Sequence, residues 1–186
     1  MLKGSEISGF NLTQSPNHVA VIVSNDWASS LSETAAVLKL CQLTAWLILS
    51  GVTFVTIYDN KNELKMSHNR IIKFLARYLD VQVRMEDIES KVFLRKNSQF
   101  SYPEQMRKAI EAPLNGLVFE KRMESIKGVD EPELAIVLDP KNKKEIFGFD
   151  PWGIRLTEFV FWKEISYSSF EKSLKSYSKV QKRFGK

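Results

Sequence analysis

The sequence is poor in the side chains that most often form covalent cross-links or bind metals. It contains one cysteine, Cys41, and two histidines, His18 and His68, among 186 residues. A single cysteine excludes an internal disulfide and a cysteine-based zinc site, and two histidines provide little for metal or triad chemistry. Cys41 stands in an apolar run, so we expect it to be a small buried hydrophobic residue.

No signal peptide or targeting motif is visible at the N-terminus. Residues 40–58 carry no formal charge and approach the length of a membrane span, but they include several polar side chains and Gly51. At Gly51 the composition changes from Leu and Ala to Val, Thr, Phe and Ile. This change predicts a helix, a glycine stop and a buried strand rather than a transmembrane segment.

The net charge of +5 and the pI near 9.2 fit phosphates, an anionic membrane surface or nucleic acid. A nucleic-acid-binding surface needs a basic patch interleaved with exposed aromatic side chains, whereas most aromatics here lie in core-like apolar runs. We therefore expect no nucleic-acid partner. The chain is 44% hydrophobic and 26% charged, which is typical of one globular domain. Residues 1–17 lack periodicity and are predicted to be a flexible leader to a domain covering 18–186.

Hydrophobic periodicity predicts an α/β domain with a central, mostly parallel β-sheet flanked by helices. The β-branched run at residues 18–23 indicates a buried strand. A helix is expected from Ser30, which forms a capping-box pattern with Glu33, to about Ser50, and a strand at 52–58. Strand, helix and strand in this order are typical of a βαβ unit with a right-handed crossover. Further elements are expected at residues 70–79 (helix), 81–84, 92–94 and 133–138 (strands), 103–110 and 117–126 (helices), and 159–162 (an aromatic segment).

In a parallel sheet, ligands bind beyond the carboxyl ends of the strands. This rule makes residues 24–29 and 59–66 the candidate ligand-binding loops. The first loop contains no Gly, Lys or Arg, and Asp26 would repel an anion unless a cation intervened. A plain connecting loop is therefore the favoured interpretation of residues 24–29.

The C-terminal segment combines an amphipathic helix with a short basic tail. Ser168 and Glu171 form a second capping-box pattern, and an apolar stripe follows at helical spacing. Because this helix docks on the core, it would deliver Arg183 and Gly185 to a fixed place. A guanidinium beside a glycine amide suits a diphosphate, through bidentate charged hydrogen bonds and close approach of the main chain. A solvated basic tail is the alternative.

Three stretches together resemble the cis-prenyltransferases, the family with the undecaprenyl and dehydrodolichyl diphosphate synthase fold. They are residues 18–23, residues 148–158 with the sequence Gly-Phe-Asp-Pro-Trp-Gly-Ile-Arg-Leu-Thr-Glu, and the terminal Arg-Phe-Gly-Lys at 183–186. The resemblance covers residues 18–186, weakly across 85–131, and is closest to the non-catalytic eukaryotic subunit of the Nogo-B receptor type. It implies the cis-prenyltransferase fold for this chain.

The sequence departs from the catalytic members of this family in three places. Those members follow the first strand with an Asp-Gly-Asn-x-Arg loop whose Asp holds magnesium, and the corresponding positions here are Ser24, Asn25 and Asp26. An Asn-Trp-x-Arg pattern is absent at residues 58–62, and an Arg-x-Ser-Gly-Glu pattern is absent at 138–142. The resemblance therefore implies a subunit without its own catalytic aspartate or metal site.

What the resemblance implies is an accessory subunit of a heteromeric cis-prenyltransferase. The enzyme would make long-chain dehydrodolichyl diphosphate from farnesyl and isopentenyl diphosphate, for dolichol synthesis and protein glycosylation. A catalytic partner subunit, in a heterodimer or higher assembly, would hold most of the Mg²⁺ ligands and the hydrophobic tunnel. Arg183, Phe184 and Gly185 would enter the partner's site and bind isopentenyl diphosphate, and Trp152, Arg155 and Glu158 would contact the partner. The expected location is the cytosolic face of the endoplasmic reticulum membrane, with this chain as a soluble portion.

Two other interpretations stay open on the sequence. The chain can be a self-sufficient, diverged cis-prenyltransferase in which Asp26 or Asp59 holds the metal, and activity of the isolated chain would support this. Alternatively, it is a receptor or scaffold that keeps the fold for binding, with an incidental tail. An inert substitution of Arg183 with intact partner binding would support the scaffold.

Overall fold

The computed structural model describes residues 15–61, 63–79, 91–96, 131–149, 154 and 156–180. Their centre is a five-stranded sheet with the strand order β3-β2-β1-β4-β5, and each neighbouring pair is parallel. The strands are β1 (His18–Val23), β2 (Phe54–Asp59), β3 (Val92–Lys96), β4 (Leu134–Leu138) and β5 (Glu158–Trp162). The helices are α1 (Asn25–Ala28), the 3₁₀-helix η2 (Ser29–Ser32), α2 (Thr34–Leu49), α3 (Glu63–Tyr78) and α7 (Tyr167–Tyr177). The predicted α/β class with a parallel sheet is confirmed.

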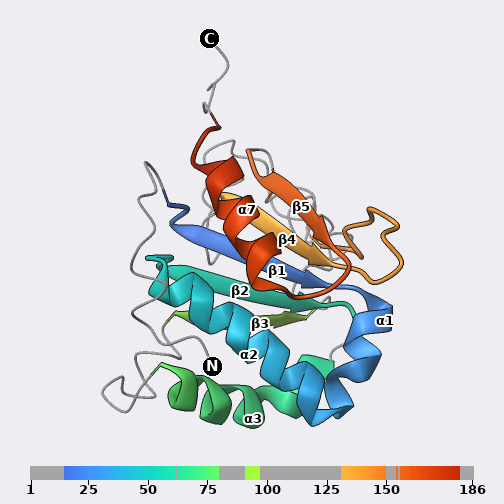
Figure 1. Cartoon of the computed structure of the whole chain (residues 1–186). Coiled ribbons are helices and arrows are strands. Elements are labelled where there is room, and N and C mark those ends of the chain that lie inside the picture. The colour runs from blue at the N-terminus through green and yellow to red at the C-terminus, as the bar shows by residue number, and fades with distance from the viewer. Residues whose placement is uncertain are drawn as a thin grey trace, which may run out of the picture.

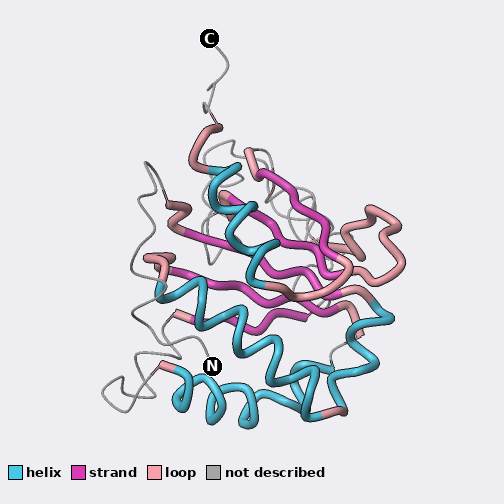
Figure 2. Tube along the Cα trace, in the orientation of Figure 1, coloured by secondary structure: helices cyan, strands magenta, loops and turns pink. Residues whose placement is uncertain are grey.

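The helices α2, α3 and α7 lie on one face of the sheet, as Figures 1 and 2 show. Because strand side chains alternate between faces, Val19, Val21 and Val23 enter the core under these helices. Ala20 and Ile22 point to the opposite face, where a smaller cluster of buried residues forms. β1 and β4 are buried along their whole length, as expected for central strands of a parallel sheet.

The first crossover is longer and more broken than the sequence predicts. One helix was expected from Ser30 to Ser50, whereas α1 and η2 precede α2, which begins at Thr34. The predicted glycine stop is confirmed, because Gly51 has a φ of 93° and the amides of residues 50–52 donate to the last carbonyls of α2. The predicted strand at 52–58 is observed as β2.

Both predicted capping boxes are wrong. The Ser30 hydroxyl donates to the Trp27 carbonyl at 2.6 Å, and Glu33 caps α2 without a side-chain hydrogen bond. At the C-terminal helix the cap is Ser166, whose Oγ accepts from the Ser169 amide at 3.2 Å. Glu171 instead pairs with a lysine one turn later.

The remaining expected elements fall partly within the described residues. α3 begins at Glu63, before the predicted start at residue 70, and β3 covers the strand expected at 92–94. The expected strand at 81–84 and the helices at 103–110 and 117–126 lie outside the described residues. Residues 15–17, assigned to the leader, contact the domain, since the Asn17 carbonyl accepts from the amides of Thr53 and Phe54.

Within the described ranges, no single helix is both long and apolar enough to cross a bilayer. The α1–η2 segment and α2 reach that threshold only as a pair, and the pair is bent by 114°.

Cys41 is expected to be unreactive while the protein is folded. Its thiol is fully buried on α2 and lies 3.6 Å from the Ile71 carbonyl of α3. Burial raises the pKa of Cys41 to about 12, so almost no thiolate, the nucleophilic form, exists at neutral pH. We expect Ellman's reagent at pH 8 to label Cys41 only after urea unfolding. Rapid labelling with an unchanged circular dichroism spectrum would contradict this placement.

Candidate functional site

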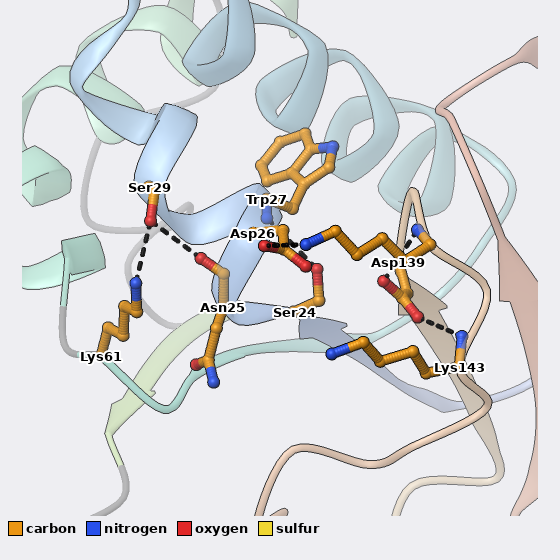
Figure 3. A network of polar contacts seen from close by, with 9 residues as sticks. Ser24, Asn25, Asp26, Trp27, Ser29, Lys61, Asp139 and Lys143 are labelled. Atoms are coloured by element: carbon orange, nitrogen blue, oxygen red, sulfur yellow. Dashed lines mark hydrogen bonds and ion pairs between the residues drawn. The ribbon is translucent and has the colours of Figure 1, made fainter.

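The candidate site is the edge of the sheet where the carboxyl ends of the strands meet. The loops after β1, β2 and β4 gather there, and Figure 3 shows their polar side chains around the short helix α1. In open parallel sheets this edge is the usual place for ligands. The two loops selected from the sequence, 24–29 and 59–66, do lie next to each other, and the loop after β4 joins them.

Ser24, the residue that follows β1, is a structural cap in this chain. Its side chain is fully buried, and its Oγ accepts a hydrogen bond from the Trp27 amide at 3.2 Å. Its backbone N–H donates to the Leu138 carbonyl at 3.0 Å, which connects the end of β1 to β4. The Ser24 hydroxyl therefore satisfies an amide at the start of α1.

Lysine side chains connect the three loops. Lys141 Nζ, from the loop after β4, lies 2.9 Å from Asp26 Oδ1 in the loop after β1. Lys61 Nζ, from the loop after β2, donates to the Ser29 hydroxyl at 3.0 Å. Figure 3 shows both contacts, with the Lys143 ammonium directed toward the same region. Lysine charge therefore lies next to the Asp26 carboxylate.

The Asp26 carboxyl has a pKa below its ordinary value of 3.8. The hydrogen bond from Lys141 is the main cause, and the charges of Lys141, Lys143 and Lys61 add to it against a smaller opposing effect of burial. Because the pKa is depressed on folding, this ion pair stabilises the fold above the ordinary pKa. That contribution is lost as the pH falls through the lowered pKa.

Replacing Lys141 with alanine is expected to raise the pKa of Asp26 toward 3.8. Both side chains are substantially exposed, at 60% and 40%, so we expect little change in thermal stability. Carboxyl-carbon NMR titration of the two proteins measures the shift. A titration midpoint for Asp26 that does not move would show that Lys141 does not hold this carboxylate in solution.

Two further aspartates at this edge are buried and bind backbone amides. Asp59 accepts from the amides of Lys61 at 2.7 Å and Leu64 at 3.0 Å, one on each carboxylate oxygen. Asp139 does the same with the amides of Lys141 at 3.1 Å and Lys143 at 2.5 Å. Each carboxylate therefore fixes the turn that follows its strand, a role that Asp commonly has at turns.

The carboxylates at this edge do not fit a magnesium ion. Magnesium is usually held by carboxylate oxygens in near-octahedral geometry, whereas those of Asp59 and Asp139 face amides and that of Asp26 faces a lysine. No group of three or more His, Cys, Asp or Glu side chains capable of holding a metal occurs in the part of the chain that the structure describes.

The residues proposed from the sequence to act on a partner lie mostly beyond the described ranges. Arg183, Phe184, Gly185, Trp152 and Arg155 are all outside them, so their roles stay predictions. Glu158 is described and is exposed as the first residue of the edge strand β5.

Sequence reasoning missed the roles of Asp139 and of the two lysines that cross between loops. Asp139 directly follows an apolar strand and precedes Pro140, a pattern that favours a side-chain-capped turn and could have indicated its role. The contact between Lys141 and Asp26 joins residues 115 positions apart, and no local pattern signals such a contact.

The sequence relatives of this chain include subunits of the dehydrodolichyl diphosphate synthase complex. Protein-family models give no match to the chain. It is 26% identical to dehydrodolichyl diphosphate synthase complex subunit nus1 of Schizosaccharomyces pombe, across 94% of this chain and 78% of that protein. It is 21% identical to the human subunit NUS1, across 96% of this chain and 69% of the human one. The resemblance predicted from the sequence motifs is thereby confirmed.

Solved structures identify the fold. A probable undecaprenyl diphosphate synthase from Campylobacter jejuni superposes with a TM-score of 0.52 and 15% identity, covering 93% of this chain and 100% of that one. The chain is therefore a homologue of the Nus1 subunits of the dehydrodolichyl diphosphate synthase complex and has the cis-prenyltransferase fold.

Proposed function

We propose that this chain is the non-catalytic subunit of a heteromeric cis-prenyltransferase and completes the active site of its catalytic partner. The partner would hold the magnesium ion and elongate farnesyl diphosphate with isopentenyl diphosphate to a dehydrodolichyl diphosphate, a precursor for dolichol and protein glycosylation. Arg183 and Gly185 would reach into that site from this chain. The complex would work at the cytosolic face of the endoplasmic reticulum membrane.

The observation that supports this proposal is how the polar side chains of the chain's own carboxyl-edge loops are hydrogen-bonded. Joining two diphosphate substrates requires cations that neutralise the departing diphosphate and position the other substrate. Here the position of the catalytic aspartate is a buried serine cap, and the nearby carboxylates bind amides or Lys141. This arrangement supports a chain that does not run the reaction alone, and it weighs against Asp26 or Asp59 as a metal ligand.

The direction of α7 supports a role for the tail in another subunit's site. Figure 1 shows α7 running from the carboxyl end of β5 to the side of the molecule away from α1 and the carboxyl-edge loops. Because α7 ends on that side of the molecule (Figure 1), a role of the following tail in another subunit's site is favoured over a role at the chain's own carboxyl edge.

The outer edge of β5, the last strand in the described sheet, is the proposed contact with the partner. β5 ends the described sheet, and its Phe159 and Phe161 rings stack at 6.4 Å while remaining partly exposed. An apolar edge strand without Lys or Pro is prone to pair with another chain. Glu158 begins this strand, and Trp152 and Arg155 precede it in the sequence, so the proposed interface is continuous along the chain.

Transfer of radiolabelled isopentenyl diphosphate onto farnesyl diphosphate with magnesium tests the proposal. The chain would be assayed alone, with a catalytic cis-prenyltransferase subunit from the same source, and with that subunit after Arg183→Ala substitution. We expect no product from the chain alone, strong activity from the pair and a collapse with the variant. Activity from the chain alone would overturn the proposal. Normal activity of an intact complex that carries Arg183→Ala would favour the scaffold interpretation.

A further inference from the structure

The C-terminal helix is joined to the sheet by a buried hydrogen bond. Trp162, the last residue of β5, donates from Nε1 to the Ser173 hydroxyl oxygen on α7 at 3.1 Å. Both residues are only 6% exposed. The Ser173 hydroxyl in turn donates to the Ser169 carbonyl at 2.9 Å. Since that hydroxyl has a single hydrogen, its oxygen can only accept from the indole, whose N–H can only donate.

This bond is directional, unlike the apolar packing around it. Phe170, Leu174 and Tyr177 bury one side of α7 against the core, and such contacts constrain the rotation and axial position of a helix only through shape. A slipped or rotated α7 would leave the indole N–H buried without an acceptor, which is strongly unfavourable. The Trp162–Ser173 pair therefore selects one register of α7 on the sheet.

The register of α7 is transmitted to the last described residue. After α7 the chain continues in hydrogen-bonded turns, because the amides of Ser178, Lys179 and Val180 donate to carbonyls of the last helical turn. The Trp162–Ser173 hydrogen bond, α7 and these turns therefore connect the sheet to Val180, the last residue before the tail.

We infer that Trp162 and Ser173 are positioning residues for the active tail, setting where Arg183 and Gly185 meet isopentenyl diphosphate in the partner's site. This inference rests on the proposed function, since a tail without a role needs no positioning. A displacement of about 1 Å at a reacting centre can cost as much as 10²-fold in rate, so a small rotation of α7 is enough for a measurable effect.

The test uses the assembled complex with the Ser173→Ala chain, which removes the acceptor and little volume. We expect kcat/KM for isopentenyl diphosphate to fall about tenfold, with the loss appearing in kcat, while the KM for farnesyl diphosphate stays unchanged. Ser173→Thr, which keeps the hydroxyl, should restore the normal kcat/KM. Ser176→Ala is the matched control, because that residue is an exposed serine on the same helix.

A second variant and a double variant keep the inference separate from a simple loss of stability. Trp162→Phe, assayed well below its unfolding temperature, should lower the same kcat/KM. In the Arg183→Ala background, Ser173→Ala should add no further defect, because both act through the tail. If Arg183→Ala collapses activity but Ser173→Ala and Trp162→Phe leave kcat/KM unchanged, the positioning role alone is overturned. If Arg183→Ala leaves the activity of the complex unchanged, the proposed function fails and this inference fails with it.

Discussion

Replacing Arg183 with alanine is expected to lower the turnover of the assembled complex by about 10²–10³, the usual cost of losing one preorganised charge from a diphosphate site. The guanidinium can make two charged hydrogen bonds to a diphosphate, and alanine makes none. Arg183→Lys should recover only part of the activity, because an ammonium keeps the charge but not the bidentate geometry. Steady-state kinetics of the purified complex, with isopentenyl diphosphate varied at saturating farnesyl diphosphate, measure the loss.

The control for this prediction is assembly itself. The variant chain should co-purify with its partner at the normal ratio and show an unchanged elution volume, because Arg183 lies beyond the docked helix. Lys179→Ala is a suitable comparison, since it removes an exposed basic side chain from the end of the described helix region and should leave turnover unchanged. Near-normal turnover of the Arg183→Ala complex would remove the tail from the mechanism.

The parallel sheet was predictable from sequence because its central strands are continuous apolar runs. β1 and β4 are buried on both faces, so every position must be apolar or hydrogen-bonded, and such runs are recognisable without any tertiary information. The same reasoning located the glycine stop of α2, because a positive φ at Gly51 is costly for other residues. These features depend only on local chemistry.

The helix starts were not predictable to the residue, because serines compete for the same role. Ser24 precedes α1 while Ser30 lies within η2, and Ser166 precedes α7 while Ser168 is the second residue of that helix. A Ser-x-x-Glu pattern marks a possible cap, but the cap that forms is the one whose side chain the tertiary structure places beside an orphan amide. Ser24 is selected because the end of β1 fixes it next to α1, and Ser166 because the chain turns there after β5.

The candidate site was predictable in location but not in its chemistry. The rule for parallel sheets placed the loops after β1 and β2 at one edge, and the structure brings them together there. That Lys141 reaches Asp26 depends on the path of the loop after β4, in which Asn142 and Lys144 adopt positive φ angles. Such a path follows from the turn fixed by Asp139, a long-range consequence that no motif in residues 24–29 contains.

Replacing Asp59 with alanine is expected to lower the free energy of unfolding by about 3 kcal/mol, because two amides lose a charged acceptor. The Leu64 amide is in a buried environment, so solvent cannot replace the carboxylate there. Chemical denaturation monitored by circular dichroism measures the loss. Asp26→Ala is the matched control, because that carboxylate is partly exposed and pairs with the exposed Lys141, and we expect it to change stability little.

Thermal unfolding with and without magnesium decides whether Asp59 can be a metal ligand of a self-sufficient enzyme. A ligand that binds only the folded state raises its stability in proportion to the logarithm of ligand concentration. If both oxygens of Asp59 are engaged by the amides of Lys61 and Leu64, millimolar magnesium should leave the melting temperature of the isolated chain unchanged. A magnesium-dependent rise that disappears in Asp59→Ala would mean that Asp59 binds the ion. That result would favour the interpretation of the chain as a diverged, self-sufficient enzyme. The chain would then hold the cation that condensation of two diphosphates requires.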